Sequence, residues 1–248
     1  MSRPKIIGVI PARLESTRLP GKVLLDVAGK PLLYRVYEAV RDCSILNELL
    51  VATDSPRVAE YCARSEIPCS STGQHHSGTD RLHEVLLRTD GDIYVNIQGD
   101  EPTVGVEHLR LLVDPLLEER ADVDVSTLCV AVDSEQAADP NVTKVVFDKR
   151  RHALYFSRLP VPYYREQSST RIFFKHIGLY AYRRRALERF HQLPPGDLEQ
   201  TERLEQLRFL ENGIPIAVAE TRRDTIGVDT PEDLERAIRY FQARATRT

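Results

Sequence analysis

The sequence has no excess of positive charge and no long apolar segment. Its 34 Lys and Arg residues stand against 37 Asp and Glu residues, which gives a formal net charge of −3. The overall basic field that favours DNA or RNA binding is therefore missing, and any anion site must be local. No apolar stretch approaches the ~20 residues needed to span a bilayer. We therefore expect neither a nucleic acid nor a membrane as a partner.

Cysteine is also scarce. The chain has four cysteines, Cys43, Cys62, Cys69 and Cys129, and none of them forms a Cys-x-x-Cys pair. This spacing argues against a zinc site or a disulfide framework. The apolar run near the N-terminus, Ile6–Ile10, is shorter than the ~7–15 residues of a signal-peptide core. We expect a cytoplasmic protein with reduced thiols.

Two common phosphate-binding motifs are absent from the loop that follows this run. Gly21-Lys22 matches the end of a P-loop, but Ser16 replaces its first glycine and Val23 replaces its metal-binding hydroxyl. A Gly-x-Gly-x-x-Gly dinucleotide fingerprint is missing as well. If this loop binds phosphates, it must do so with side-chain cations and loop amides.

The same loop does carry cations and hydroxyls. Between Pro11 and Lys22 it holds the side chains of Arg13, Ser16, Thr17, Arg18 and Lys22. The short apolar run before it is typical of a buried parallel strand, and ligands bind where such strands end. Three positive charges at that point suit a polyanion such as a nucleoside triphosphate. The alternative is a basic surface loop whose charges are solvated.

The first half of the chain alternates between short apolar runs and helical periodicity. After the first strand, the pattern predicts strands at 49–53, 67–69 and 92–97, and helices at 31–43, 55–64, 78–88 and 106–119. This rhythm predicts an α/β fold with a mostly parallel, doubly wound sheet. A chain of 248 residues suits one such domain, 1–248.

The middle of the chain breaks this rhythm. Extended patterns at 124–132, 143–148 and 173–182 have no full helices between them, which predicts a strand-rich, partly antiparallel excursion over 124–182. Helical periodicity returns at 184–192 and 202–212, with Gly213 placed as a C-terminal cap. A strand at 216–219 and a last helix opened by Thr230-Pro231 complete the pattern.

Two aspartates are candidate metal ligands. Asp100 follows the apolar strand that ends near Ile97, and it therefore lies at the carboxyl edge of the sheet beside the cationic loop. Asp229 precedes Thr230, and the helix start is already satisfied by Thr230 and the acids of the first turn. Oxygen ligands of this kind suit Mg²⁺ shared with substrate phosphates. The alternative for Asp100 is a helix cap, and Asp229 alone is a weak signal.

Further polar residues occur at helix starts and strand ends. Ser77-Gly78-Thr79 opens a helix and could bind an anion or a base, although by itself this motif is more often an ordinary helix start. Arg158 follows a predicted strand and suits bidentate capture of a carboxylate, against the alternative of a surface arginine. His176 and Tyr180 share one face of a predicted strand, where a lone histidine is more often structural.

Taken together, these segments are similar to the 3-deoxy-manno-octulosonate (Kdo) cytidylyltransferase family, the CMP-Kdo synthetases. The resemblance covers nearly the whole chain in the family's order and rests on the segments 10–22, 51–54, 76–81, 96–102, 153–158, 176–180, 204–208 and 227–234. It implies a Rossmann-like, glycosyltransferase-A-like nucleotidyltransferase fold, with the strand-rich excursion contributing to the sugar site and to a homodimer interface.

The resemblance also implies an activity. The enzyme would transfer CMP from CTP to the anomeric 2-hydroxyl of Kdo, with Mg²⁺ as cofactor and pyrophosphate as second product, and so activate Kdo for lipopolysaccharide biosynthesis. A related sugar acid, 8-amino-Kdo or sialic acid, is the alternative acceptor. A non-catalytic nucleotide-binding protein on the same fold is the rival from another class, but it would be expected to lose a metal ligand or a loop cation.

The resemblance assigns roles to residues of this chain. Arg13, Lys22, Asp100 and Asp229 would be catalytic, and the two aspartates would hold the metal. The nucleotide would be bound by Arg13, Ser16, Thr17, Arg18, Lys22, Thr53, Ser77, Gly78, Thr79 and Gln98. The sugar acid would be bound by Arg158, His176, Tyr180, Glu205 and Gln206.

Overall fold

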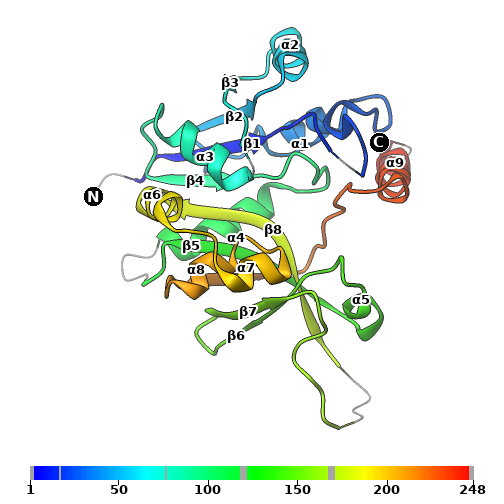
Figure 1. Ribbon diagram of the computed structural model, residues 1–248. Coiled ribbons are helices and arrows are strands. Elements are labelled where there is room, and N and C mark those ends of the chain that lie inside the picture. Colours follow the sequence, from blue (N-terminus) through cyan, green and yellow to red (C-terminus); the bar gives the residue numbers. More distant parts are fainter. Residues whose placement is uncertain (1–2, 17, 76, 118–121, 167–170, 246–248) are drawn as a thin grey trace. The chain divides into compact units, whose positions relative to one another are not determined.

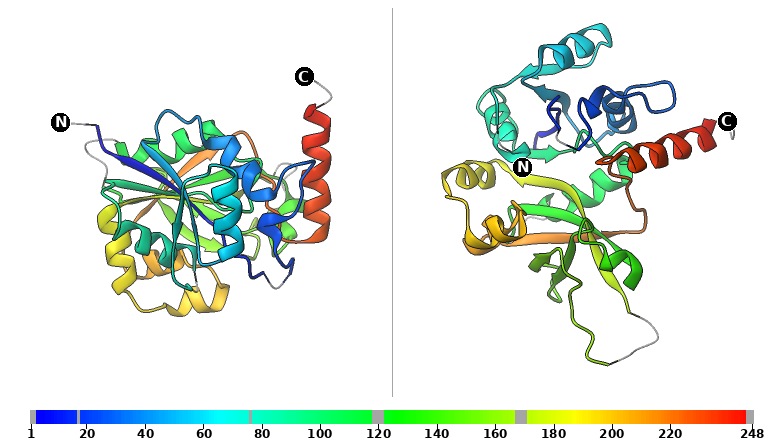
Figure 2. Two further views of the ribbon diagram at one scale, coloured as in Figure 1. Left: turned by 90° about the horizontal axis from the view of Figure 1, so that it is seen from above. Right: turned by 45° about the vertical axis from the view of Figure 1, so that its right-hand side comes forward.

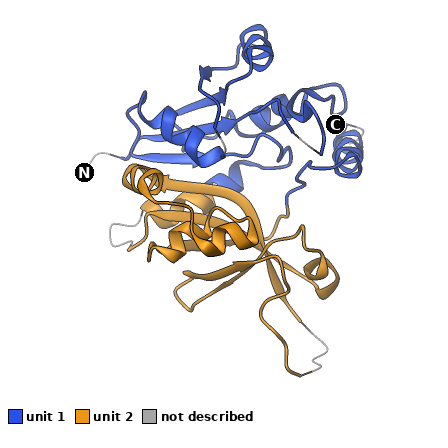
Figure 3. Ribbon diagram, viewed as in Figure 1, with its two compact units in different colours: residues 1–109, 225–248 blue, residues 110–224 orange. Residues whose placement is uncertain are grey.

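The computed structural model describes residues 3–16, 18–75, 77–117, 122–166 and 171–245. The chain divides into two compact units (Figure 3). The first comprises residues 1–109 together with 225–248, and the second comprises residues 110–224. The strand-rich segment expected at 124–182 lies inside the second unit.

The first unit contains a fully parallel four-stranded arrangement in the order β3-β2-β1-β4. Its strands are β1 (Ile6–Pro11), β2 (Glu48–Thr53), β3 (Cys69–Ser71) and β4 (Ile93–Asn96). Every residue of β4 and all but the last of β1 are buried, as expected for strands covered on both faces. The strands alternate with the 3₁₀ turn η1 (Lys22–Leu24) and the helices α1 (Leu32–Val40), α2 (Pro56–Arg64) and α3 (Gly78–Leu86) (Figure 1). The predicted parallel α/β sheet is confirmed.

The third strand begins two residues later than predicted. Glu66 adopts a left-handed conformation, with φ of 54°, directly after α2. The amide of Ile67 donates to the carbonyl of Cys62 at 2.9 Å, and that of Glu66 donates to the carbonyl of Ala63 at 3.4 Å. These two bonds form a Schellman motif, in which an apolar residue follows the left-handed position. Ile67 therefore belongs to the end of the helix, and the strand starts at Cys69.

The last helix, α9 (Pro231–Ala245), begins as predicted. The hydroxyl of Thr230 accepts the amide proton of Asp233 at 3.2 Å, and the Asp233 carboxylate accepts the amide of Thr230 at 3.1 Å. Ala237 of α9 packs in one apolar cluster with Val27 and Leu32, so the C-terminal helix lies against the η1–α1 segment (Figure 2). Among the helices of the described ranges, none is both long and apolar enough to cross a membrane.

The second unit is built on a mixed sheet. In it, β5 (Val125–Val132) pairs antiparallel with β8 (Phe173–Arg183) and parallel with β9 (Ile216–Thr221), and the hairpin of β6 (Lys144–Phe147) and β7 (Ala153–Ser157) pairs with β8 through β6. The partly antiparallel prediction is confirmed. The helices of this part of the chain are α4 (Val106–Leu117), which begins in the first unit, and α5 (Ser134–Ala138), α6 (Arg184–Gln192), α7 (Asp197–Glu202) and α8 (Leu207–Glu211).

The predicted helix over 202–212 is confirmed only in part: α8 covers Leu207–Glu211, but Glu202 is the last residue of α7 and residues 203–206 are not helical. Arg203 ends α7 in a left-handed conformation with φ of 57°, and the amide of Leu204 returns to the carbonyl of Glu199 at 3.2 Å. Apolar side chains lie on both sides of this break, so the helical periodicity continues through it. The predicted cap is confirmed: Gly213, with φ of 66°, ends α8.

Candidate active site

Lys22 lies at the centre of a cluster of charges in the first unit. Its Nζ donates to Asp100 Oδ2 at 2.5 Å, to Asp229 Oδ1 at 2.8 Å and to the carbonyl of Val228 at 3.2 Å. The guanidinium of Arg18 contacts the other oxygen of Asp229 at 3.0 Å. Two cations therefore balance two carboxylates. The structure brings together four residues of the predicted site from three segments that are far apart in the sequence.

Close backbone packing brings these segments together. A Cβ atom on Gly99 would lie 2.8 Å from the carbonyl oxygen of Pro11, so only glycine lets the loop after β4 approach the end of β1 this closely. Gly21 has φ of 68° and turns the chain into η1, which begins with Lys22. The amide of Val228 donates to the carbonyl of Asp100 at 2.9 Å. This bond joins the segment before α9 to the loop after β4.

The cluster shifts the titration of its members. Burial alone would lower the pKa of Lys22, but Asp100 and Asp229 outweigh it and raise that pKa above its ordinary 10.5. Burial alone would raise the pKa of Asp229, but Lys22 and Arg18 outweigh it and lower that pKa below its ordinary 3.8. Lys22 and Asp229 are both charged at neutral pH as a result.

The rest of the cationic loop is less constrained. Arg13 is exposed, and among the described residues it has no hydrogen-bond or ion-pair partner. The hydroxyl of Ser16 accepts the amide of Leu19 at 3.4 Å, which places it inside a turn of the loop. Thr17, also predicted in the nucleotide site, lies outside the described residues. Arg13 is thus an exposed cation near the end of β1.

The start of α3 lies beside the ends of β1 and β4. A Cβ atom on Gly78 would meet the Asn96 amide at 3.6 Å and the Pro11 ring at 3.7 Å. The hydroxyl of Ser77 caps the helix by accepting the amide of Asp80 at 3.1 Å, and it donates to the Asp80 carboxylate at 3.0 Å. The buried Oδ1 of Asn96 has no hydrogen-bond partner among the described residues. The structure thus gathers predicted nucleotide-site residues at one sheet edge and adds Asn96, which the sequence analysis did not single out.

A buried arginine holds the same edge. The Arg81 side chain, only 3% exposed, pairs with Asp54 at 3.1 Å and donates to the hydroxyl of Thr72. It thereby joins α3 to the segments after β2 and β3. Thr53, the last residue of β2, is buried and accepts the amide of Ser55 through its hydroxyl at 3.1 Å. Two further predicted residues, Thr79 and Gln98, lie in the first turn of α3 and directly after Ile97.

In the second unit, His176 and Tyr180 lie together, as predicted. Their ring centroids are 5.4 Å apart, and Phe156 of β7 meets His176 edge-on at 5.0 Å. His176 Nε2 lies 3.0 Å from the hydroxyl oxygen of Thr127. A bulge in the β5–β8 pairing falls between these two residues of β8, because Tyr180 lies opposite Thr127 while Ile177 lies opposite the next residue of β5.

The polar groups of this cluster are neutral. Desolvation, with a smaller contribution from the Lys175 charge, lowers the pKa of His176 from 6.5 to about 3. Burial raises the pKa of Tyr180 well above 10.0, and the nearby Tyr182 and Glu205 add to this shift. The Tyr180 hydroxyl and the Gln206 Nε2 are buried, and each lacks a hydrogen-bond partner in the described part of the chain. Such groups suit a polar ligand that supplies the missing bonds.

Arg158 follows β7 and is oriented by main-chain carbonyls. Its Nε donates to the carbonyl of Glu202 at 2.7 Å, and its two terminal nitrogens donate to the carbonyls of Pro140 at 3.2 Å and Arg203 at 3.5 Å. A guanidinium has five N–H groups, so two remain without a partner among the described residues. Arg158 is therefore not an unconstrained surface arginine.

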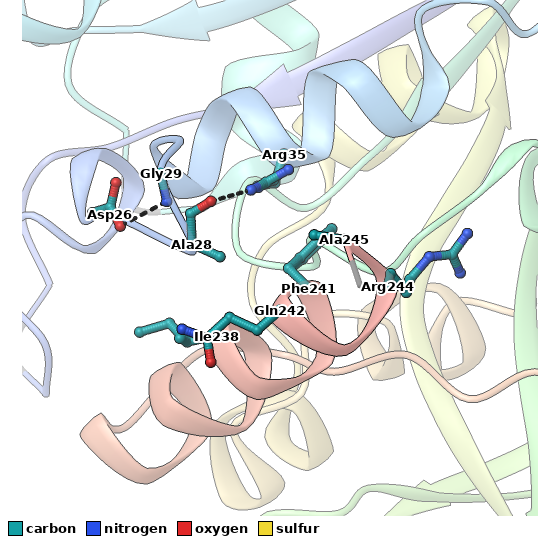
Figure 4. Close-up of a pocket in the computed structure, with 9 residues that line it drawn as sticks. All are labelled: Asp26, Ala28, Gly29, Arg35, Ile238, Phe241, Gln242, Arg244 and Ala245. Carbon is teal, nitrogen blue, oxygen red and sulfur yellow. Dashed lines mark hydrogen bonds between the residues drawn. The ribbon is translucent and has the colours of Figure 1, made fainter. Parts of the chain in front are cut away.

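An open cavity of about 970 Å³ in the first unit contains none of the predicted site residues (Figure 4). Its lining includes Arg35 and Phe241. The Arg35 guanidinium lies 4.5 Å from the centre of the Phe241 ring, and it donates to the carbonyls of Val27 and Ala28. This arginine holds the loop before α1 against α9, which is a structural role.

Comparison with known proteins assigns the chain to a family. The family model described as cytidylyltransferase matches residues 7–221. The chain belongs to the cytidylyltransferase family. The matched range contains every predicted site residue except Asp229.

Individual relatives are similar over nearly their full length. The chain is 49% identical over 241 residues to a 3-deoxy-manno-octulosonate cytidylyltransferase of Koribacter versatilis, covering 97% of this chain and 91% of that protein. It is 45% identical over 233 residues to the protein of that name from Escherichia coli, covering 94% of each. A solved structure of CMP:2-keto-3-deoxy-manno-octonic acid synthetase complexed with CTP has a TM-score of 0.92 and 42% identity, covering 97% of this chain and 99% of that one.

Proposed function

We propose that this cytidylyltransferase transfers CMP from CTP to the anomeric 2-hydroxyl of Kdo, giving CMP-Kdo and pyrophosphate. The family match and the names of relatives at 45% and 49% identity support this activity. The observation in the structure that carries it is the convergence of Asp100 and Asp229 on one cationic group at the end of parallel strands. In sheets of this kind, ligands bind at that edge.

The nucleotide is proposed to bind in the first unit. Arg13 and Lys22 would contact the triphosphate, aided by Ser16, Thr17 and Arg18 in the same loop. The cytosine and ribose would lie among the side chains gathered at the sheet edge, Thr53, Ser77, Gly78, Thr79 and Gln98. Arg13 supports this assignment because it is a cation that no described residue neutralises.

Asp100 and Asp229 fit a magnesium ion. Their oxygens already converge on a single cation, the ammonium of Lys22, at 2.5 and 2.8 Å. Mg²⁺ is commonly held by one or two carboxylates together with substrate phosphates, so two aspartates and a triphosphate are a suitable donor set. When bound, such an ion lowers the pKa of a coordinated hydroxyl and offsets charge on phosphate oxygens. Lys22 would then exchange its carboxylate partners for phosphate oxygens.

The sugar acid is proposed to bind in the second unit. His176 and Tyr180, both neutral, would hydrogen-bond its hydroxyl groups, and Glu205 and Gln206 would contact it from the turn between α7 and α8. The buried polar atoms of Tyr180 and Gln206 that lack partners support this assignment. Arg158 would hold the carboxylate through its two remaining N–H groups, in the planar geometry that a guanidinium offers.

The chemistry requires positioning and charge stabilisation. The 2-hydroxyl oxygen forms a bond to the α-phosphorus, the bond between that phosphorus and the bridging oxygen to the β-phosphate breaks, and the hydroxyl proton passes to solvent water. Arg13 and Lys22 would stabilise the charge that accumulates on the departing pyrophosphate. No side chain of the proposed site needs to form a covalent intermediate, because holding both reactants in line is itself a large contribution.

We propose that the enzyme acts in the cytoplasm as a homodimer. All four cysteines are free, which agrees with a reducing compartment. In the second unit, Leu154, Leu159 and Tyr163 are 63%, 71% and 87% exposed, on and after β7. Exposed apolar side chains on an extended segment favour a protein partner, here a second copy of the chain. Sedimentation that shows only monomer at micromolar concentration would contradict the dimer.

The test of the activity is pyrophosphate release. We expect release only when CTP, Kdo and Mg²⁺ are all present, with each omitted in turn as a control. Sialic acid and 8-amino-Kdo, offered in place of Kdo at the same concentration, should give slower release. Equal or faster release with either of them would reassign the acceptor while leaving the reaction type intact.

A further inference from the structure

The carboxylate of Glu202, the last residue of α7, binds the end of β7. Its Oε2 accepts the backbone amide of Arg158 at 3.0 Å, and its Oε1 accepts the hydroxyl of Ser157 at 2.8 Å. The phenol of Tyr155 reaches the same Oε1 at 3.5 Å. One side chain thus fixes alternate residues of β7 and the residue that follows the strand.

The side chain of Arg158 in turn binds the backbone of Glu202. Its Nε donates to the main-chain carbonyl of Glu202 at 2.7 Å, so each residue binds the backbone of the other. The next residue, Arg203, is held in the left-handed conformation, and the chain then continues through Glu205 and Gln206. Glu202 therefore joins the end of β7 to the turn between α7 and α8, and α8 lies beside β7 (Figure 1).

A second charged residue holds the other side of the same peptide. Lys144 of β6 is fully buried, and its ammonium donates to the carbonyls of Asp139 at 3.1 Å, Val142 at 2.6 Å and Arg158 at 2.5 Å. Burial lowers the pKa of Lys144, although the charges of Asp139 and Glu202 oppose this shift. A buried lysine is costly unless its protons are all bonded, and here three carbonyls satisfy all three.

We propose that Glu202 and Lys144 are positioning residues for the sugar acid. The amide of Arg158 is bound by a carboxylate and its carbonyl by an ammonium, so the backbone from which the Arg158 side chain extends is fixed on both sides. This inference rests on the proposed function, in which Arg158 holds the carboxylate of Kdo. Neither Glu202 nor Lys144 touches the substrate in this proposal; both act through Arg158.

The proposal predicts a selective kinetic defect. In Glu202→Ala, the Ser157 hydroxyl and the Arg158 amide lose their acceptor. The backbone at Arg158 is then no longer anchored, so its side chain is less precisely positioned. The KM for Kdo should rise on the order of tenfold, the scale of a hydrogen bond to a charged group. The KM for CTP should change less than about twofold, since the CTP site is assigned to other residues and a twofold change is only about 0.4 kcal/mol.

Glu202→Gln tests whether hydrogen bonding is what matters. The amide oxygen of Gln can accept the Arg158 N–H, and its NH₂ group can donate to the Ser157 hydroxyl oxygen. We expect Gln to restore most of the affinity for Kdo that Ala loses. A Gln variant as weak as the Ala variant would contradict this reading. Ser157→Ala is the milder variant if Glu202→Ala does not fold, and we expect it to raise the KM for Kdo about threefold.

Glu199 offers a matched control in the same helix. It is more deeply buried than Glu202, pairs with Arg208 at 2.5 Å, and among the described residues its carboxylate has no hydrogen bond or ion pair to β7. Glu199→Ala should lower the thermal unfolding midpoint without changing the KM for Kdo. If Glu199→Ala and Glu202→Ala raise that KM equally for the same loss of stability, Glu202 is merely structural and the proposal is wrong.

Amide hydrogen exchange separates this inference from the proposed function. Because it needs no substrate, it reports the anchoring directly: exchange at the Arg158 amide should accelerate in Glu202→Ala and stay unchanged in Glu199→Ala. Unchanged exchange in Glu202→Ala would show that Glu202 does not anchor the Arg158 backbone, and the proposal would be wrong. If the wild-type enzyme releases no pyrophosphate with Kdo, the proposed function is wrong instead. The sugar-acid role of Glu202 and Lys144 then fails as well, even if the exchange data confirm that Glu202 anchors Arg158.

Discussion

Acidification from pH 7 to pH 5 should destabilise the folded protein by about 2 kcal/mol through His176 alone. The perturbation is mild, because it changes the protonation of the unfolded chain and leaves the native contacts of His176 intact. Desolvation and the Lys175 charge lower the pKa of His176 from 6.5 to about 3 in the folded protein. Its stabilising contribution is therefore complete above pH 6.5 and is lost as the pH falls from 6.5 towards 3.

The magnitude follows from the number of protons bound. Between the two pKa values the unfolded chain carries nearly one proton more than the native protein at this position. Stability then falls by about 1.4 kcal/mol for each pH unit. At pH 7 the unfolded histidine is mostly neutral, and at pH 5 it is almost fully protonated, so the difference across this interval is about 2 kcal/mol.

The assay is urea unfolding at pH 7 and pH 5, at one protein concentration, for the wild type and for His176→Asn. Asparagine can keep a hydrogen bond to Thr127 and has no titration in this range. The other histidines are common to both proteins, so the difference in pH dependence isolates His176. We expect the variant to lose about 2 kcal/mol less than the wild type on acidification. Equal losses would refute the reasoning and would mean that His176 accepts a proton readily in the folded protein.

The remaining predictions concern the proposed catalytic groups. Asp100→Asn and Asp229→Asn should each lower kcat by about 10²-fold or more at saturating Mg²⁺, on the scale of losing one preorganised electrostatic group, and near wild-type kcat in stopped assays would remove them from the mechanism. Lys22→Ala and Arg13→Ala should weaken CTP binding far more than Kdo binding in isothermal titration; if neither CTP affinity nor kcat changes, the loop is only a solvated surface. Arg158→Lys should raise the KM for Kdo well beyond that for CTP, because an ammonium cannot bind a carboxylate bidentately, and a variant that alters only CTP kinetics would contradict the assignment.

Features that depend only on neighbouring residues could be predicted from the sequence. The apolar run Ile6–Ile10 predicted a buried parallel strand, and Ser55-Pro56 and Thr230-Pro231 predicted helix starts that the structure confirms. These signals are reliable because the hydrogen bonds and rotamer preferences that produce them act within a few residues. The motif residues also predicted the family, since they occur in one order along nearly the whole chain.

Sequence patterns gave wrong element boundaries where the same pattern of apolar residues fits two backbone conformations. The stretch 202–212 has continuous helical periodicity, yet the chain breaks at Arg203, where its neighbour Glu202 is bound to β7. Ile67 has the apolar character of a strand residue but closes the end of α2. At Glu202 the bonds that fix the break include a distant partner, the end of β7, whereas at Ile67 the bonds are local but apolar character alone does not distinguish a helix end from a strand.

Which charged side chains contact one another could not be predicted from the sequence and is seen in the folded chain. The sequence predicted Lys22 as a phosphate-binding cation and Asp100 and Asp229 as metal ligands, but it did not predict that the lysine would bond both carboxylates. It gave no role to Lys144, although a lysine within an apolar strand pattern was a signal for a buried charge. Partners separated by many residues are brought together by the packing of the whole unit, and the free energy of a buried charge depends on those partners. For this reason a sequence can predict that a charged residue matters, while its partner is known only from the folded chain.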